Sequence, residues 1–560
     1  MPAAGGARTW LARWRRIRLD GRLPEQVERL LGTVLRLRAR DLADRLAAAV
    51  RPVAGTRRWS IDASDGLVRR AGGRRWRVED RLRMPYHDLA HEHAGVVTAA
   101  LRSRDVAYRV IDAVPAGGLV LAVDTADRRR ALAALRDPLV TDSRAWHLEW
   151  RRGHVRHVRL VGDGRVPSSA ARADTWWVYT LTDDGTSSVG GRQQAVEVGF
   201  WERLAVGGCE RLGERGLARF DATAEPTVEI LDGRRYPGLS TAPVQHGLRR
   251  LEEPIDLVYT WVDGSDPAWR QQYDAWSERM RPGEQAVHPA RFRSRDELRY
   301  SLRSAWAYAG WFRSIHLVTA GHVPEWLTAH DRVHVVEHSA ILPPDALPTF
   351  NSHALEANLH RIPNLAEHFV YLNDDFFVGR PLAPTAFFTA NGLAKVFEEE
   401  ARIEGRFKGG PPRDADVAAR NGADLIERRF GVRIGRKLHH APFALRRSVL
   451  EQLSVEFAEA VEATTHSRFR SPTDVSVASA FAHHYGLCRG EAVLGHLQIG
   501  YTYVAHVLLS WHLQRLALGR SDDVFCLNET EAIAARPEQV DDRVVRFLEG
   551  YFPHPAPWER

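Results

Sequence analysis

The sequence predicts an α/β protein whose C-terminal half is a mainly parallel sheet, preceded by a smaller α+β domain and an N-terminal helix. After residue 254, continuous apolar strands alternate with amphipathic helices, which is the pattern of a parallel sheet covered on both faces. Between residues 85 and 240, short strands accompany one clear helix, ADRRRALAALR. A chain of 560 residues is long enough for two or more domains with cores of their own.

The composition limits the class of partner and the compartment. The net charge is +7, but acidic and basic residues are interspersed, which argues against nucleic acid as a partner. The three cysteines, Cys209, Cys488 and Cys526, are scattered and odd in number. Neither a disulfide framework nor a zinc cluster is therefore expected, and a reducing cytosol is favoured.

The chain carries no apolar run of about 18 residues, so no transmembrane helix is predicted. The N-terminus also lacks the apolar stretch of a secretory signal. We expect a cytoplasmic protein. Peripheral contact with the inner face of the cell membrane stays open, because tryptophan lies beside arginine in WLARWRR.

The first 250 residues are predicted to form two units without recognisable chemistry. Residues 1–84 are assigned to a helical segment, because apolar residues recur at helical spacing in QVERLLGTVLRLRARDLADRLAAAV. Residues 85–250 are assigned to a small α+β domain of unknown role. Its predicted strands are VAYRVIDAV, GLVLAVD, HVRLVG, TWWVYTLT and QAVEVGFWERL.

Residues 251–535 are predicted to form the second domain, followed by a C-terminal tail at 536–560. Its predicted strands are IDLVYTWV, SIHLVTAG, RVHVVEH and HFVYLNDD. The stretch RDELRYSLRSAWAYAGWF is an amphipathic helix with Leu298, Leu302 and Trp306 on one face. A short helix, SHALEANLHRI, is expected to be capped by Asn351 or Ser352.

Two carboxylates interrupt the apolar stretch FVYLNDDFFVG. Asn373, Asp374 and Asp375 follow the fourth strand, as Asp263 and Gly264 follow the first, and ligands gather beyond the carboxyl ends of parallel strands. Such a pair suits Mg²⁺ or Mn²⁺ bridging phosphates, although spacing alone equally supports a carboxylate that caps the next segment. Because strand side chains alternate, we expect Asp375 to coordinate the cation and Asp374 to join it or orient a neighbour.

Arginines are concentrated in RFRSRDELRYSLRS. Arg299 and Arg303 are four residues apart and share a helix face. An arginine-rich face is ordinarily solvated, but beside a metal-type acidic pair it is better explained by phosphate binding. The nearby stretch PTFNSHALEANLHR adds polar side chains suited to hydroxyl groups: Asn351, Ser352 and Glu356.

Five stretches together resemble the four ordered regions of the Stealth family. They are IDLVYTWVDGSDPAW, RFRSRDELRYSLRSAW, LPTFNSHALEANLHRIPNLAEHFVYLNDDFF, HHAPFALRRSVL and SRFRSPTDVSVASAFAHHYGL. The resemblance spans residues 254–530 and leaves the first 250 residues uncovered. This family includes bacterial capsule and exopolysaccharide sugar-phosphate transferases and the catalytic part of animal N-acetylglucosamine-1-phosphotransferase.

The resemblance implies a glycosyltransferase-A-like domain that transfers sugar 1-phosphate from a nucleotide sugar, such as a UDP-sugar, to a glycan hydroxyl. A nucleoside monophosphate would leave and a phosphodiester of a capsule or exopolysaccharide would form. The alternative within enzymes is a conventional glycosyltransferase that releases a nucleoside diphosphate. A catalytically idle glycan-binding or scaffold protein is a third hypothesis, which the intact acidic, histidine and arginine positions disfavour.

The resemblance also implies roles for individual residues. His440 is the first candidate for the general base, with Asp296 as its rival, His439 as an unresolved neighbour and a purely structural histidine as the alternative. Arg470 would neutralise charge on the transferred phosphoryl group. The cation would be held by Asp374, Asp375 and Asn373. The residues implied to bind substrate are Asp263, Gly264, Arg291, Glu297, Arg299, Arg303, Asn351, Ser352, Glu356 and Asp474.

Overall fold

The structure is a computed structural model of the chain. It describes residues 61–62, 68–71, 74–77, 85–113, 118–141, 146–152, 155–160, 168–180, 194–203, 209–211, 219–220, 227–231, 234–238, 251, 253–283, 286–403, 413–529 and 537–560. The predicted helix in residues 26–50 therefore lies outside the described residues.

Within the predicted helical segment 1–84, the described residues form strands. These are β1 (Ile61–Asp62), β2 (Val68–Ala71) and β3 (Arg74–Arg77), which pair in the order β1-β2-β3. The helical prediction is wrong for these residues. Strand β3 reads RRWR, and the stretch lacks the helical apolar spacing found earlier in the chain, so local pairing with β2 decides its conformation.

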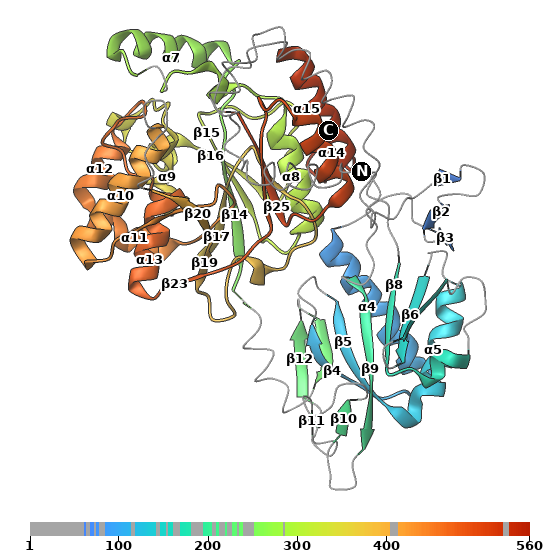
Figure 1. The fold of residues 1–560 in the computed structure, drawn as a ribbon. Helices are drawn as coiled ribbons and strands as arrows, with labels where there is room; N and C mark the ends of the chain where they lie inside the picture. Colours follow the sequence, from blue (N-terminus) through green and yellow to red (C-terminus); the bar gives the residue numbers. More distant parts are fainter. Residues whose placement is uncertain are drawn as a thin grey trace, which may run out of the picture.

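The next unit is an α+β domain, as the sequence predicts. A mixed sheet runs in the order β12-β13-β4-β5-β9-β8-β6-β7, and Figure 1 shows helices α4 and α5 packed beside it. The elements are α4 (Tyr86–Ser103), β4 (Tyr108–Ala113), β5 (Leu119–Asp124), α5 (Arg128–Thr141), β6 (Trp146–Arg152), β7 (Val155–Leu160), β8 (Thr175–Thr180), β9 (Val196–Arg203), β10 (Cys209–Arg211), β11 (Arg219–Phe220), β12 (Thr227–Leu231) and β13 (Arg234–Gly238).

The C-terminal domain is built on a five-stranded sheet in the order β16-β15-β14-β17-β22. The pairs β14–β15, β14–β17 and β15–β16 are parallel, and β22 closes the edge antiparallel to β17. The prediction of a mainly parallel sheet is therefore confirmed. The strands are β14 (Ile255–Thr260), β15 (Ile315–Thr319), β16 (Val333–Glu337), β17 (His368–Asn373) and β22 (Phe443–Arg446).

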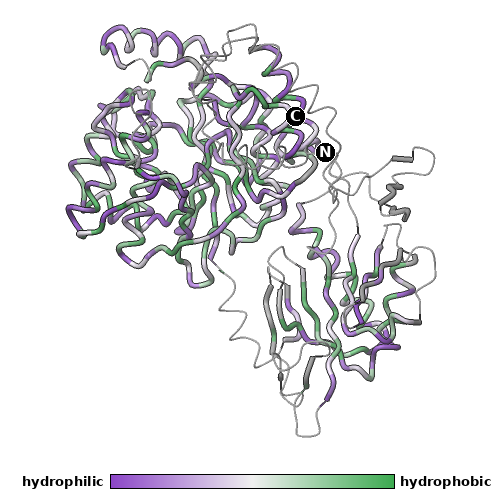
Figure 2. The backbone as a smooth tube through the Cα atoms, viewed as in Figure 1, coloured by the Kyte–Doolittle hydropathy of each residue, from purple (hydrophilic) through white to green (hydrophobic). Residues whose placement is uncertain are grey.

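Helices cover both faces of this sheet (Figure 1). One group contains α9 (Ser352–Glu356), α10 (Asp414–Phe430), α11 (Arg447–Glu456), α12 (Ala458–Thr465) and α13 (Ala482–Arg489), the last preceded by a π-helical turn, η10 (Val477–Phe481). The other contains α8 (Glu297–Tyr308), α14 (Leu509–Gly519) and α15 (Pro537–Tyr551), while α7 (Pro267–Met280) projects from one end. Figure 2 shows hydrophobic residues concentrated in the strands between these layers.

Smaller sheets complete the domain. Strands β18 (Phe376–Val378), β25 (Val524–Asn528) and β24 (Ile499–Tyr503) form a three-stranded sheet, in which β25 lies between the other two. The remaining pairs are β19 (Ala394–Val396) with β23 (Ala492–Leu494), and β20 (Glu398–Arg402) with β21 (Arg436–Leu438). Since β18 continues the chain directly beyond β17, this small sheet begins at the carboxyl end of the main sheet.

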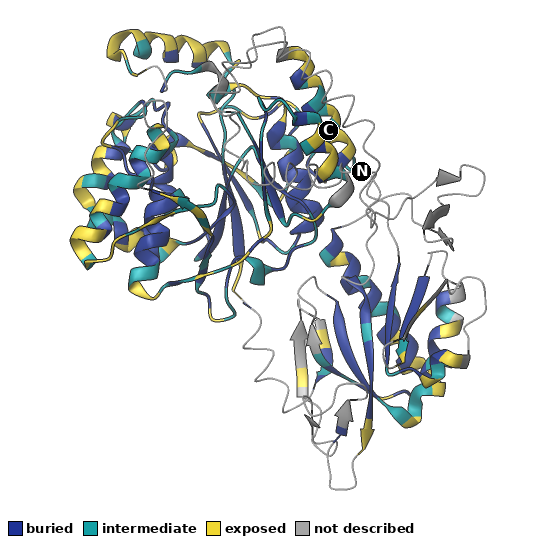
Figure 3. Ribbon diagram, in the orientation of Figure 1, coloured by how far each residue is buried: buried dark blue, intermediate teal, exposed yellow. Residues whose placement is uncertain are grey.

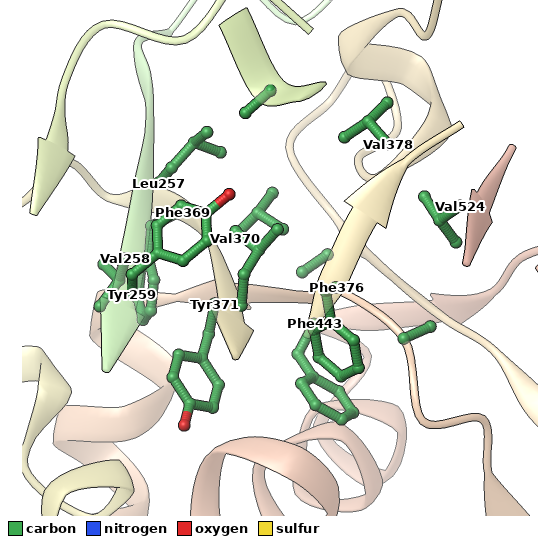
Figure 4. Close-up of a cluster of buried hydrophobic side chains, with 14 of the residues drawn as sticks. Leu257, Val258, Tyr259, Phe369, Val370, Tyr371, Phe376, Val378, Phe443 and Val524 are labelled. Carbon is green, nitrogen blue, oxygen red and sulfur yellow. The ribbon is translucent and has the colours of Figure 1, made fainter. Parts of the chain in front are cut away.

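The core of the domain lies on the central strands. Burial is continuous along β14, β15 and β17, whereas the outward faces of the covering helices are exposed (Figure 3). Figure 4 shows side chains of this core, among them Leu257, Phe369 and Phe376. Complete burial of such a side chain stabilises the fold by about 1.5–3 kcal/mol relative to exposure. The loops at the carboxyl ends of the strands are therefore supported by a packed apolar core.

The last residues of the chain are part of this core. Val544 and Leu548 of α15 are fully buried, and so is Trp558, beyond the end of that helix. The separate C-terminal tail predicted at 536–560 is therefore wrong, because the amphipathic face of α15 and the residues after it pack against the domain. Among the described residues, no helix has the length and apolar character needed to cross a membrane.

Candidate active site

Asp374 and Asp375 form the turn that joins β17 to β18, at the carboxyl end of the sheet. The Asp375 Oδ2 atom accepts hydrogen bonds from the Cys526 thiol at 3.2 Å and the Asn528 amide at 3.5 Å. Its Oδ1 atom is buried without a hydrogen-bond partner among the described residues, as is Asn528 Oδ1. Each of these unpaired oxygen atoms is a ligand that a hard cation accepts.

The negative charge around this turn also favours the binding of a cation. Burial raises the pKa of Asp374 well above its usual range, and the neighbouring charges of Asp375 and Glu297 add to the shift. Burial likewise raises the pKa of Glu297, although Arg295 pairs with it at 3.1 Å. Carboxylates this close repel one another unless a proton or a cation intervenes. The acidic turn is therefore a place where a divalent ion would relieve repulsion.

His440 lies beside the acidic turn. One ring nitrogen of His440, a carboxylate oxygen of Asp375 and the sulfur of Cys526 lie within 4.8 Å of one another. The edge of the imidazole packs against Phe376, with 4.6 Å between ring centroids. Burial lowers the pKa of His440, against the opposing influence of Asp375 and Glu356. A neutral imidazole at neutral pH can accept a proton, as a general base must.

The neighbouring histidine has a different environment. The backbone amide of His439 donates to the Phe397 carbonyl at 2.9 Å, and its side chain lies near His496. Burial lowers the pKa of His439, but no carboxylate contributes to that shift. The geometry therefore favours His440 over His439 as the histidine of the site.

Two arginines face this site from different segments. Arg470 is half-buried, and burial lowers its pKa despite the nearby charges of Glu356, Asp414 and Asp474. Burial and the charge of Arg470 lower the pKa of Arg291 to about 9. Arg470 donates to the Ser352 hydroxyl at 3.2 Å and Arg291 to the Ala286 carbonyl at 2.7 Å, but neither forms an ion pair within the described part of the chain. Two adjacent, half-buried guanidinium groups without an ion-paired carboxylate are a site for an anion.

Several predicted binding residues hold these groups in place. Asn351 caps α9 by accepting from the His353 amide at 3.1 Å and donates to Asp474 Oδ2 at 2.8 Å. The same Asp474 oxygen accepts from the Ser471 amide at 3.0 Å, next to Arg470. Asn351 and Asp474 are fully enclosed, so they act by positioning the arginine segment and not by touching a ligand.

Glu356 lies nearer to the chemistry. Its Oε2 atom accepts from the Ser479 hydroxyl at 2.8 Å, and its charge acts on both His440 and Arg470. Ser479 belongs to the π-helical turn η10, and such turns are frequent at functional sites. Glu356 is thus placed between the candidate base and the candidate phosphate ligand.

The loop after β14 is packed against the arginine site. Asp263 accepts from the Ser265 amide at 2.8 Å and hydroxyl at 2.6 Å, which stabilises the loop. A Cβ atom on Gly264 would lie 2.3 Å from the Phe292 carbonyl oxygen, next to Arg291. Only glycine allows this approach, so Gly264 determines how closely the loop and Arg291 meet.

Gly264→Ala is therefore expected to displace the segment that carries Arg291. Overpacking of this kind costs about 1–3 kcal/mol in the free energy of unfolding. We expect a lower unfolding midpoint in denaturant and weaker donor binding, both measured on the full chain. Gly283→Ala is the matched control, because a Cβ there meets open space. Equal behaviour of the two variants would show that the contact is unimportant.

Three predicted residues lie elsewhere. Arg299 and Arg303 pair with Glu559, each at 2.7 Å, and Arg303 also donates to the Phe552 carbonyl at 2.9 Å. Their prediction as phosphate ligands is wrong, because the C-terminus of the chain occupies their helix face. Asp296 is exposed at the start of α8, where its charge acts on Arg299 and Tyr300 and not on the candidate base site.

Cys526 and Asn528 of β25, which contact Asp375 in the acidic turn, are not among the residues predicted from the sequence. A signal for them exists. The stretch VFCLNE repeats the pattern of FVYLND, an apolar strand ending in asparagine and an acid. Tyr501 on β24 was also missed; its ring centroid lies 6.3 Å from that of His440.

Comparison with known proteins identifies this arrangement. Stealth protein conserved regions 1, 2, 3 and 4 match residues 253–281, 291–396, 439–487 and 515–560. An exopolysaccharide phosphotransferase of Streptomyces coelicolor is 35% identical over 578 residues, covering 100% of this chain and 97% of the relative. The chain belongs to the Stealth family. The prediction of a transferase enzyme of this family is thereby confirmed.

Other Stealth relatives are similar over shorter spans. The exopolysaccharide phosphotransferase CpsY of Mycobacterium tuberculosis is 40% identical over 376 residues, covering 65% of this chain and 69% of the relative. Among solved structures, the galactosyltransferase LgtC, in complex with donor and acceptor sugar analogs, covers 53% of this chain and 95% of its own. Its TM-score is 0.28 at 12% identity, which is too low to carry an argument. The Stealth regions include every side chain of the acidic turn, both histidines and Cys526.

Proposed function

We propose that this Stealth protein transfers sugar 1-phosphate from a nucleotide sugar to a hydroxyl of a growing exopolysaccharide or capsule glycan. The acceptor oxygen would attack the β-phosphorus, and the bond between that phosphorus and the bridging oxygen would break. A nucleoside monophosphate would leave, and the sugar would keep its anomeric configuration. The names of the relatives, which are exopolysaccharide phosphotransferases, support the polymer class.

The observation that carries the proposal is the pair Arg291 and Arg470. Both are half-buried and neither has an ion-paired carboxylate among the described residues, so a dianionic phosphate group would satisfy them together. Burial in a low-dielectric site makes their attraction for charge on the transferred phosphoryl group stronger than it would be in water. Asp414 acts on both guanidinium groups through its charge, and a sugar without its phosphate would bring no further negative charge to them.

The acidic turn supplies the opposite half of the site. Asp375 and Asn528, with their unpaired oxygen atoms, would hold Mg²⁺ or Mn²⁺, and Asp374 would support them from behind. A bound ion of this kind would neutralise charge on the donor diphosphate. Asn373, the last residue of β17, keeps the turn in register through its pairing with Thr260 of β14.

His440 would accept the proton of the acceptor hydroxyl. It is the imidazole beside the acidic turn, and its neutral form has a free electron pair for this proton. Glu356, whose charge favours the imidazolium, would stabilise the protonated base that results. The rings of Phe376 and Phe443 contact the imidazole and would help to hold it in position.

The test separates phosphate transfer from sugar transfer by the nucleotide released. The full chain is incubated with a panel of nucleotide sugars, a glycan acceptor and Mg²⁺, and the products are resolved by chromatography. Release of a nucleoside monophosphate is the expected result, for instance UMP from a UDP-sugar. Release of a nucleoside diphosphate would instead establish a conventional glycosyltransferase and overturn the proposal.

His440→Asn is expected to lower kcat by about 10²–10⁴-fold, the usual contribution of a positioned general base. Donor binding, measured by calorimetry, should change little, because the arginine pair is intact. His439→Asn serves as the matched control, since its side chain lies near His496 and not beside the acidic turn. Equal turnover in the two variants would exclude His440 as the base.

A further inference from the structure

We infer that Asp375, His440 and Cys526 form a binding site for Zn²⁺ or a chemically similar borderline ion. The three side chains arrive from separate parts of the chain: the turn after β17, the residues before β22, and β25. Their ligand atoms lie within 4.8 Å of one another, and the Cys526 sulfur is 3.2 Å from Asp375 Oδ2. Small side-chain shifts bring one oxygen, one nitrogen and one sulfur to the distances of a single zinc ion.

The donor set decides which ion this site prefers. Mg²⁺ takes oxygen ligands and rarely accepts imidazole or thiolate, whereas Zn²⁺ binds all three of these groups. Asp375 would be a ligand of either ion. Asn528 would join it in binding the hard cation, whereas Cys526 and His440 would join it in binding the soft one. The two ions therefore compete for one carboxylate.

The surroundings favour retention of the ion. Cys526 is fully buried, and neither ring nitrogen of His440 has a hydrogen bond within the described ranges. Asp375 Oδ1 is enclosed without a partner among the same residues, so an ion would satisfy an atom that they do not. The rings of Phe376 and Tyr501 lie beside the imidazole and limit its movement.

Binding has a simple proton balance. The sulfur–hydrogen bond of Cys526 breaks, a sulfur–zinc bond forms, and the proton passes to solvent. His440 and Asp375 each contribute an electron pair without losing a proton, provided that the imidazole is neutral. A fourth position would stay open to water or substrate, as it does at zinc sites with three protein ligands.

Occupation by zinc would stop the transfer reaction. The ion would take the electron pair with which His440 accepts a proton and would withdraw Asp375 from the hard cation. This consequence rests on the proposed function, whereas the binding of the ion does not. Zinc would thus act as a competitive inhibitor with respect to Mg²⁺.

The binding test uses Co²⁺ as a spectroscopic substitute for Zn²⁺ in the full chain, without substrate. A near-ultraviolet thiolate-to-cobalt charge-transfer band is expected at one equivalent, and added Zn²⁺ should abolish it. Cys526→Ser should lose the band, whereas Cys488→Ser, a half-buried cysteine on α13, should keep it. Absence of the band in the wild-type chain, or an unchanged band in Cys526→Ser, would overturn the inference.

A second variant provides a test if Cys526→Ser does not fold. His440→Asn keeps the thiol and should weaken Co²⁺ binding by about 10- to 100-fold, a typical cost of disturbing a metal site. Unchanged affinity would also overturn the inference. If the cobalt band forms but no nucleotide sugar is turned over, the metal site stands and the proposed transferase reaction fails. Turnover without a cobalt band would mean that the transferase reaction stands and the metal site fails.

Discussion

Asp375→Asn should lower turnover by about 10²–10³-fold or more, the cost of losing one preorganised electrostatic group at a reacting centre. The amide keeps the size of the carboxylate but not its charge, so it would hold Mg²⁺ poorly. Folding should survive, because the substitution removes one of the charges that repel each other at the β17–β18 turn. Turnover under saturating donor and thermal unfolding without divalent ions test the two statements together.

The control for this variant is Asp345→Asn, since Asp345 is an exposed carboxylate that pairs with His466 at the surface, and Arg468 donates only to its backbone carbonyl. A further readout separates binding from chemistry. Mg²⁺ should raise the unfolding temperature of the wild-type chain and of the control, but not that of Asp375→Asn. Near-normal turnover in Asp375→Asn, or an undiminished Mg²⁺ effect on its unfolding, would remove Asp375 from the cation site.

Glu559→Ala should have the largest effect on stability. The Glu559 side chain is fully buried and pairs with Arg299 and Arg303, whose side chains are 26% and 10% exposed. Removing one partner from a buried pair leaves uncompensated charge and costs about 3–5 kcal/mol in the free energy of unfolding. Denaturant unfolding of the full chain measures this loss. Turnover per folded molecule should stay close to the wild-type value, because these arginines are paired with the C-terminus.

Acid should mimic this substitution. Burial alone would raise the pKa of Glu559, but hydrogen bonds from Arg303 and Arg299 lower it below its usual 4.5 overall. The pair therefore stabilises the fold above about pH 4.5, and this contribution is lost as pH falls through the lower folded pKa. Glu549→Ala, an exposed position on α15, is the matched control. Equal stability of the two variants would show that the pairing of Glu559 with the two arginines, the C-terminal clamp, is not needed.

The C-terminal clamp also explains why sequence reasoning misassigned the arginines. Arg299 and Arg303 were correctly placed on one face of α8, because helical periodicity is a local property. The partner against which that face packs, however, is not determined by the local sequence. Glu559 lies 256 residues beyond Arg303, and only packing of α15 and the chain end against α8 brings the two together. A phosphate and a buried carboxylate can both pair with two arginines, and the sequence of the helix does not distinguish between them.

At the acidic turn, too, the local sequence pattern predicted some residues of the site and could not predict others. The pattern of an apolar strand ending in Asn373, Asp374 and Asp375 was enough to place both carboxylates at the carboxyl edge of a parallel sheet. It was not enough to find Cys526 and Asn528, which approach Asp375 across 151 and 153 residues. Their strand joins the site only because β25 pairs with β18.

The amino-acid sequence was thus enough to predict the alternation of strands and helices, a cap at Asn351 or Ser352, the acidic turn and the membership of the family. Each of these depends on spacing within a short stretch or on ordered motifs, and both can be read without knowledge of the third dimension. Only the packing of the whole chain shows that His440 and not His439 lies beside Asp375, that Arg291 and Arg470 have no ion-paired carboxylate among the described residues, and that the Cys526 thiol lies next to Asp375. The physical reason is that a side chain's charge and reach are local properties, whereas its partners are chosen by the packing of segments more than a hundred residues apart.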